Sequence, residues 1–292
     1  MELKNTILLA ALSVLAWGCN SPASQKQQET ESHTQPVKDY ETLSTVRLTV
    51  SESKRLIAKG IAANKEIQNR LKHGMVIITL GTTNTYIAEE LAGLQAPRGS
   101  FVTGRIFPAS KEDFAKDLTR HPEIVMIDGK VTDLSYADAL ARMKPEDIVL
   151  KGANMLNYAK RQAAVCMGAP DGGTVARLRK YTDQGKGRWI IPIGLEKETT
   201  QDLFELQKLV NNSAHRDKST VRLNASQGNV YTEIEAIKEF ADIDVFITAK
   251  GGVDGAEGGV SLLLCGSNTE VQKAQKVIQA ILGELAFTHQ PA

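Results

Sequence analysis

The sequence predicts an α/β protein with two folded parts, a parallel-sheet, Rossmann-like domain and a second, smaller α+β domain of the ferredoxin-like kind. Three observations predict this fold class. Short apolar runs have the length of buried strands, glycine turns follow them, and helical patterns follow the turns. The clearest case is the apolar run at 75–80, with a glycine turn at 81–84 and a helical pattern at 86–91. Parallel strands need such crossover connections.

The first domain is expected to span residues 45–212. It opens with an alternating, strand-like run at 45–50, and Thr49 and Glu52 then have the spacing of a capping box. The helix that follows is expected to break near Asn64 and to bury one apolar face. That face consists of Leu56, Ile57, Gly60, Ile61, Ile67 and Leu71.

The order of strand, glycine turn and helix recurs along this domain. Further strands are expected at residues 123–127, 147–150, 163–167 and 189–193. Turns follow them at 128–129, at 151–152, at 168 with 172–174, and at 194–197. Irregular, partly polar sequence between Gly93 and His121 interrupts the order.

The smaller domain is expected to span residues 213–292. A strand at 221–225 leads to a helix capped by Thr232 and Glu235, and strands at 243–249 and 260–265 form a hairpin. Ser267 and Glu270 cap a last helix. Its buried face consists of Val271, Ala274, Val277, Ile278 and Ile281.

The N-terminus has the pattern of an export signal. Lys4 precedes an apolar run too short to span a bilayer, and the run ends at Leu15-Ala16-Trp17-Gly18-Cys19, which resembles the bacterial lipobox. We expect a signal peptide at residues 1–18, a lipid on Cys19 and a disordered tether at 19–44, which is almost free of apolar residues. The expected location is the bacterial cell envelope, with a lipid-anchored membrane protein. An ordinary secretory signal and an uncleaved anchor are the alternatives.

Two glycine turns are candidate anion sites. The residues are Gly81, Thr82, Thr83 and Asn84 in the first turn, and Gly172, Gly173 and Thr174 in the second. Free N–H groups of a first helical turn bind phosphate or carboxylate, and the ends of parallel strands gather ligands in one crevice. The alternative for each turn is an ordinary helix cap.

Three loops together resemble the signature loops of ribose-5-phosphate isomerase A, in the NagB/RpiA/CoA-transferase-like superfamily. They are the turn at 81–84, Asp128-Gly129 after Ile127, and residues 149–156. The resemblance implies a phosphate site at Thr82, Thr83 and Asn84, with Lys151 as a nearby cation. It also extends to Ile191-Pro192-Ile193 and to residues 231–246.

The loops depart from that family where its acids would stand. Lys130-Val131-Thr132 follow Gly129 in place of the acidic continuation, and Lys160 occupies the position of the family's glutamate base. Proton abstraction beside a carbonyl needs such a base. Isomerase activity is therefore not expected, and Asp128, Lys151 and Glu196 are the remaining acid–base candidates.

Other classes of function lack their signals. A formal net charge of +1 gives no reason to expect nucleic-acid binding, the five histidines lack metal-ligand spacing, and no nucleotide-binding or hydrolase motif is present. We therefore predict no cofactor and no metal site. Cys166 and Cys265 read as buried free thiols, with a disulfide as the alternative. The glycine-rich stretch at 250–259 reads as a mobile hairpin turn or a ligand-gating loop.

Three hypotheses of function follow. The first is a membrane-anchored lipoprotein that binds a small phosphate- or carboxylate-bearing ligand without turning it over. The second is a divergent isomerase- or hydrolase-like enzyme on the same scaffold. The third is a structural lipoprotein with no small ligand. The sequence does not indicate an oligomeric state.

Overall fold

The computed structural model describes residues 38–104, 106–108, 110–217 and 219–288. This part of the chain is a mixed α/β protein with eight α-helices and three β-sheets, which confirms the predicted class at that level. The helices are α1 (Val50–Ala63), α2 (Lys65–Lys72), α3 (Thr82–Ala92), α4 (Tyr136–Arg142), α5 (Gly173–Thr182), α6 (Leu203–Asn212), α7 (Glu233–Lys238) and α8 (Asn268–Gln279), with a short 3-10 turn η1 (Leu195–Lys197). The strands are β1 (Thr42–Leu48), β2 (Met75–Ile78), β3 (Ile124–Ile127), β4 (Lys130–Thr132), β5 (Ile148–Leu150), β6 (Met155–Asn157), β7 (Gln162–Met167), β8 (Arg188–Pro192), β9 (Arg222–Gln227), β10 (Val230–Tyr231), β11 (Asp244–Lys250) and β12 (Val260–Gly266).

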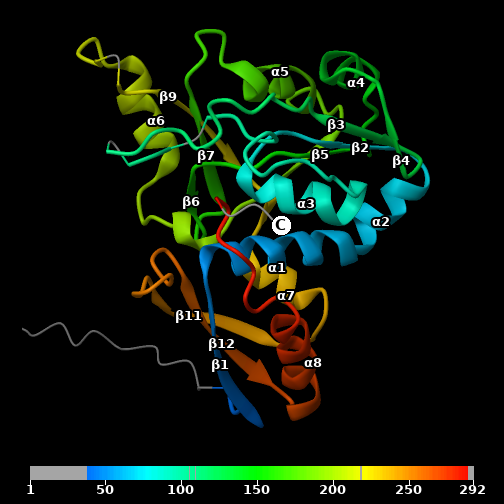
Figure 1. The fold of residues 1–292 in the computed structure, drawn as a ribbon, viewed down its shortest axis with the longest axis vertical. Coiled ribbons are helices and arrows are strands. Elements are labelled where there is room, and N and C mark those ends of the chain that lie inside the picture. The colour runs from blue at the N-terminus through cyan, green and yellow to red at the C-terminus, as the bar shows by residue number, and fades with distance from the viewer. Residues whose placement is uncertain (1–37, 105, 109, 218, 289–292) are drawn as a thin grey trace, which may run out of the picture. The chain divides into compact units, whose positions relative to one another are not determined.

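The largest sheet has six strands in the order β10-β8-β5-β2-β3-β4. Strands β10, β8, β5 and β2 run parallel to one another. Helix α3 lies on one face, while α4 and α5 lie on the other (Figure 1). Every residue of β2 and β5 is buried, as their apolar runs predict for strands covered on both faces.

The strand expected at 123–127 forms, but not in the expected direction. β3 runs antiparallel to β2 and continues as a hairpin into β4. Asp128 and Gly129 are the two central residues of that hairpin turn, with φ of 48° and 77°. A two-residue turn of this kind needs left-handed conformations at both positions, which Asp-Gly supplies. The prediction of a parallel strand is wrong here because the Asp-Gly pair favours a hairpin over a crossover.

The strand expected at 163–167 belongs to a different sheet. β7 pairs antiparallel with β6 and with β9, and α6 packs against β9. A tight turn with Arg161 at φ 53° joins β6 to β7, so no crossover helix precedes β7. The prediction that this run lies in the parallel sheet is therefore wrong.

The third sheet brings both ends of the described chain together. β12 lies between β1 and β11, all pairs are antiparallel, and α8 packs against β1 and β12 (Figure 1). The hairpin predicted at 243–249 and 260–265 and the Ser267 cap are confirmed. Three strand pairings connect the predicted ranges 45–212 and 213–292, namely β1 with β12, β7 with β9 and β8 with β10. The described residues from Tyr40 onward form one compact unit.

Helix α1 follows the sequence pattern closely. Thr49 and Glu52 form the predicted capping box, and Asn64 ends α1 and caps α2. At Gly60 an added Cβ would lie 2.6 Å from the Cα of Ala236, so glycine permits the close approach of α1 to α7. The buried face of α1 belongs to one hydrophobic core that includes residues from both ends of the described part of the chain.

The predicted signal peptide and Cys19 lie outside the described residues, as does most of the tether. The end of the tether range is ordered, since β1 begins at Thr42. Across the described ranges, no helix is both long and apolar enough to span a bilayer.

Candidate functional site

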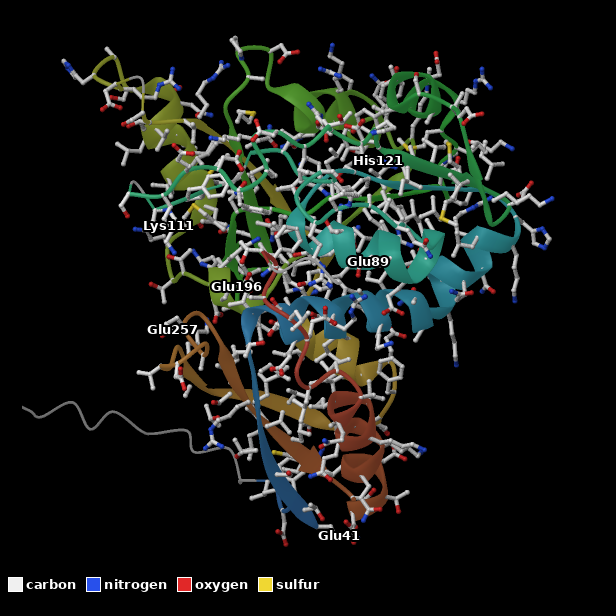
Figure 2. The ribbon with its side chains drawn as sticks, in the orientation of Figure 1. Glu41, Glu89, Lys111, His121, Glu196 and Glu257 are labelled. Carbon is white, nitrogen blue, oxygen red and sulfur yellow. The ribbon has the colours of Figure 1, made fainter. Side chains whose placement is uncertain are left out.

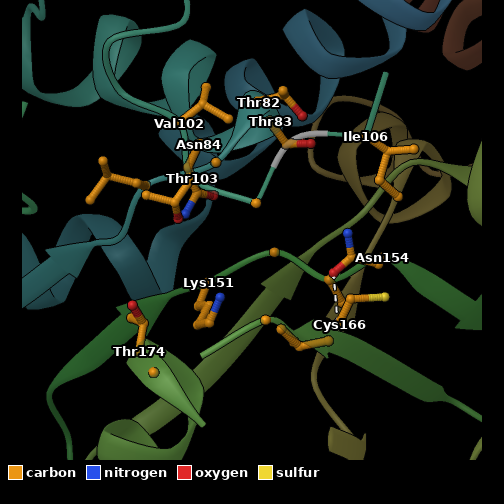
Figure 3. Close-up of a pocket in the computed structure, with 18 of the residues that line it drawn as sticks. Thr82, Thr83, Asn84, Val102, Thr103, Ile106, Lys151, Asn154, Cys166 and Thr174 are labelled. Carbon is orange, nitrogen blue, oxygen red and sulfur yellow. Dashed lines mark hydrogen bonds between the residues drawn. The ribbon is translucent and has the colours of Figure 1, made fainter. Parts of the chain in front are cut away.

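A cavity of about 960 Å³ opens beyond the carboxyl ends of β2 and β5 (Figure 3). All eight residues predicted from the sequence to bind a ligand border this cavity. They are Gly81, Thr82, Thr83, Asn84, Lys151, Gly172, Gly173 and Thr174. The fold thus brings together loops that lie up to about ninety residues apart. The loops after β2 and β5 meet because these parallel strands end at the same edge of the sheet, and the third loop comes from β7 of the neighbouring antiparallel sheet.

The start of α3 presents its first turn to the cavity without a side-chain cap. Gly81 is the N-cap, its own N–H donates to the carbonyl of Phe101 at 3.0 Å, and the helix begins at Thr82. Among the eight helices described, only α3 and α5 lack a capping side-chain acceptor at the N-cap. Both of these helices begin at the cavity. Uncapped N–H groups of a helix N-terminus attract anions.

The hydroxyl groups near this turn differ in availability. The Thr85 hydroxyl donates to the carbonyl of Gly81 at 3.0 Å, and Thr85 does not border the cavity. The Thr83 hydroxyl has no hydrogen-bond partner within the described residues, and Thr83 borders the cavity although it is buried. Thr83 is therefore the better placed of the two to meet a ligand.

Asn84 connects the two central strands and leaves one acceptor unused. Its Nδ2 donates to the carbonyls of Thr79 and Leu150, both at 2.8 Å. These two acceptors identify Nδ2 as the nitrogen, so Oδ1 is the remaining acceptor. Asn84 is 1% exposed, and its Oδ1 has no partner among the described residues. An unpaired buried acceptor costs about 1–3 kcal/mol, which a ligand donor would recover.

The second turn, at the start of α5, is partly capped by the nearby side chain of Asp171. Gly172 is left-handed, with φ of 79°, and begins α5 without a side-chain cap of its own. The N–H of Gly173 donates to Asp171 Oδ1 at 2.9 Å. This N–H and the nearby Arg177 guanidinium hold the pKa of Asp171 below its usual value. The α5 turn is therefore less open to an anion than the α3 turn.

Lys151 provides an unpaired amine in the same cavity. In Figure 3 its side chain lies below Thr103 and Asn84 in the view. The Nζ atom has no hydrogen-bond or salt-bridge partner in the described ranges. Burial lowers the pKa of Lys151 to about 8, with Glu123 opposing the shift and Lys197 adding to it. The backbone is held in place, because Trp189 Nε1 donates to the Lys151 carbonyl at 2.8 Å.

A second lysine at the cavity belongs to a buried charge cluster behind it. Lys197 Nζ donates to the carbonyl of Ala153 at 2.9 Å, and burial lowers its pKa although Glu196 opposes the shift. Glu196, which is labelled in Figure 2, pairs with Lys54 at 3.2 Å. It is not among the residues that border the cavity. Against the effect of burial, Lys54 and Lys197 hold the pKa of Glu196 below its usual value.

Glu233 completes this cluster. It is 0% exposed, and its carboxylate accepts the Leu195 N–H at 3.0 Å. Burial raises the pKa of Glu233 to about 7, and the negative charge of Glu196 adds to the shift. The sequence does not mark Lys197, Lys54 and Glu233 as neighbours, because only tertiary packing brings them together. A lysine directly after Glu196 was the one local signal.

One wall of the cavity is aromatic and comes from segments without regular structure. The irregular sequence after Gly93 provides Phe107 and Phe114, and the C-terminal segment provides Phe287. Their ring centroids lie 6.1 Å apart for Phe107 and Phe114 and 6.3 Å apart for Phe114 and Phe287. The stretch that interrupts the sequence pattern is thus a wall of the site.

Several other sequence-based candidates lie elsewhere. Asp128 sits in the β3–β4 turn and, like Glu196, is not among the residues that border the cavity. The same holds for the glycine-rich residues 250–259. Cys166 and Cys265 are free thiols, and Cys166 borders the cavity. No group of three or more His, Cys, Asp or Glu side chains in the described part is arranged to hold a metal ion.

Comparison with protein-family models, with curated proteins and with solved structures finds no match to this chain. The geometry of the cavity is therefore the basis for the functional argument.

Proposed function

We propose that the protein binds a small phosphate- or carboxylate-bearing ligand in this cavity without turning it over. One observation carries the proposal: the uncapped start of α3 and the unpaired amine of Lys151 border the same cavity. Helix N–H groups and a cation are the two elements of a typical anion site. The loops resemble those of the NagB/RpiA-like superfamily. We therefore also propose that the chain belongs to this superfamily, with a Rossmann-like and a ferredoxin-like part.

The charges around the cavity favour an anion. Within the described residues, five cationic side chains and two carboxylates border it. The cations are Lys111, Arg120, Lys151, Arg177 and Lys197, and the carboxylates are Glu112 and Glu123. A cleft of one dominant sign raises the local concentration of ligands of the opposite sign.

The cavity is larger than a bare anion requires. A volume of about 960 Å³ is typical of sites for ligands of drug or cofactor size. The ring cluster of Phe107, Phe114 and Phe287 offers apolar surface to the part of the ligand beyond its charged group. We therefore expect a ligand that joins an anionic head to a larger, partly apolar body.

We infer that the ligand is not turned over because few carboxylates border the cavity. Among the described residues at the cavity, the only carboxylates are Glu112 and Glu123, while Asp128 and Glu196 lie outside it. Val131 and Thr132 stand where the resembling isomerase family has its acidic pair, and Lys160 stands where that family has its glutamate base. If no compound binds in the test below, the alternative is a structural lipoprotein without a small ligand.

Membrane anchoring through Cys19 is the second part of the proposal, and the lipobox-like residues Leu15 to Cys19 support it. We expect Cys19→Ser to abolish lipid incorporation and membrane retention, because the thiol is the acylated atom. Incorporation of labelled palmitate into the variant, together with its retention in the membrane fraction, would contradict the assignment.

Thr83→Ala tests the anion site directly. Removing one hydrogen bond to a charged group costs about 1.5–3 kcal/mol, so affinity should fall about 10- to 150-fold. Titration calorimetry with inorganic phosphate and with a panel of phosphorylated and carboxylated compounds measures the loss. The panel also includes compounds with and without an apolar body.

Thr85→Ala is the matched control. It removes the same hydroxyl two residues away, where the group bonds to Gly81 and does not face the cavity. We expect it to lower stability and to leave affinity unchanged. If no compound binds the wild-type protein, or if both variants bind alike, the α3 turn is only a helix start.

A further inference from the structure

We propose that Lys151 forms a reversible imine with an aldehyde or ketone that also carries the anionic group. This inference rests on the proposed function, because the same cavity holds the anion. It assigns the ligand a carbonyl group, and it assigns Lys151 a covalent role besides that of a cation.

The other buried or partly buried cations have partners, which distinguishes them from Lys151. Lys54 pairs with Glu196, Arg55 pairs with Glu90 and Glu284, and Arg98 pairs with Glu284. The amine of Lys197 donates to the Ala153 carbonyl. Among these buried or partly buried cations of the described residues, only the Lys151 amine has neither a salt bridge nor a hydrogen bond, and Lys151 borders the cavity.

An amine in this setting is suited to attack a carbonyl group. Desolvation favours the neutral form of lysine, and neutral lysine is the nucleophile in imine formation. With a pKa of about 8, roughly a tenth of the amine is neutral at pH 7. A lysine at the reference pKa is neutral in fewer than about one molecule in a thousand. Glu123 and Lys197 are the charged groups that act on the amine.

The reaction balances without a further reactant. The nitrogen lone pair of Lys151 attacks the carbonyl carbon and gives a carbinolamine. Loss of the carbonyl oxygen as water, with the two amine protons, leaves the C=N bond. The reverse reaction with water releases the ligand unchanged.

Asn84 supplies an acceptor that such an adduct needs. Asn84 borders the cavity, and its buried Oδ1 has no partner among the described residues. Its Nδ2 donates to the carbonyl of Leu150, the residue before Lys151. Asn84 and Lys151 do not hydrogen-bond to each other. A carbinolamine hydroxyl or a protonated imine N–H placed between them has Oδ1 as its acceptor, while the α3 turn holds the anionic group.

The test uses the purified full-length protein and pyridoxal 5′-phosphate, a phosphate-bearing aldehyde, as the probe. Borohydride reduces the imine to a stable amine, and peptide mass mapping identifies the labelled lysine. We expect the Lys151 peptide to be labelled at least about tenfold faster than that of Lys180, an exposed lysine of α5. Pyridoxine 5′-phosphate, which has an alcohol in place of the aldehyde, should give no adduct.

Two variants check the assignment. Lys151→Arg keeps the charge but cannot form an imine, so it should lose the fast adduct, while Lys180→Arg should keep it. Labelling of Lys151 no faster than Lys180, or fast labelling at Lys197 instead, overturns the proposal. If Lys151 stays unlabelled while phosphate binds, only the imine fails. If Lys151 is labelled fast while phosphate neither binds nor slows labelling, the anion site fails and the reactive amine stands.

Discussion

Glu233 shows how a single buried carboxyl links the site to pH. It lies behind the cavity wall with Glu196, Lys54 and Lys197, and its carboxylate interacts with the backbone N–H groups of Leu195 and Glu233 and with the Ser53 side chain. Its pKa of about 7 in the folded protein exceeds the reference value of 4.5. The unfolded chain therefore releases this proton at lower pH than the folded protein does.

The difference between the folded-state and unfolded-state pKa of Glu233 determines how the free energy of unfolding changes with pH. Below about pH 4.5 the carboxyl is protonated in both states, and between 4.5 and about 7 only the unfolded state ionises freely. Glu233 thus lowers the free energy of unfolding as pH rises through this window, by roughly 3 kcal/mol at most. We expect Glu233→Gln to gain roughly 2–3 kcal/mol relative to wild type between pH 5 and pH 8, as measured by urea unfolding.

The exposed Glu146→Gln serves as a control for removing a carboxylate. If the stability of Glu233→Gln follows the same pH profile as that of the wild type, ionisation of this carboxyl costs the folded protein no extra free energy.

The sequence could not predict this group. Glu233 stands two residues before the capping residue Glu235, and its burial depends on η1 and α1, which are distant in sequence.

Residues of the glycine turns, by contrast, could be predicted. Gly81, Lys151 and Gly172 each follow an apolar run, and the rule that strand ends share a crevice places two of these runs side by side. Gly172 reached the cavity although its strand was assigned to the wrong sheet. The aromatic residues Phe107 and Phe287 were not predictable, because no periodic pattern marks an irregular wall.

At the level of elements, the C-terminal segment ties α1 to α3. Glu284 accepts from Arg55 at 2.8 Å and from Arg98 at 2.6 Å, and the two guanidinium groups lie 4.7 Å and 4.5 Å from the ring centre of Tyr86. Although burial opposes it, these hydrogen bonds hold the pKa of Glu284 below its usual value. Phe287 then packs against Tyr86 at 6.0 Å and reaches the cavity.

We expect Glu284→Gln to lower the free energy of unfolding by about 2–4 kcal/mol, because Arg98 stays buried and loses one of its carboxylates. Glu112→Gln is the matched control, since it removes an exposed pair with Lys116 that is worth at most about 0.5 kcal/mol. Chemical denaturation of both variants measures the difference. Equal costs for the two would show that the C-terminal segment adds no stability.

Helix signals in the sequence were the most reliable local information. Thr49, Thr232 and Ser267 begin helices at the expected residues, since a cap depends on neighbours three residues away. Strand direction was less predictable. An apolar run such as residues 123–127 is equally compatible with a parallel and an antiparallel partner, and the turn that follows decides between them.

For the whole molecule, the strand pairings across residue 212 have a direct test. A fragment of residues 45–212 lacks β9, β10 and β12, the partners of β7, β8 and β1. We expect it to show no cooperative thermal unfolding by circular dichroism, whereas residues 40–292 should unfold in one transition. A cooperatively folding fragment would support an independent first domain.

The pairing of β1 with β12 also determines when the protein finishes folding. Thr42 lies opposite Gly266, so an early-synthesised strand waits for one of the last to appear. A chain that leaves the ribosome or a translocation channel N-terminus first keeps β1 without its partner through nearly the whole passage. β1, the first strand of the described residues, therefore pairs only after β12, the last of them, has emerged. A chain halted before residue 260 leaves β1 without its partner strand and open to pairing with neighbouring chains.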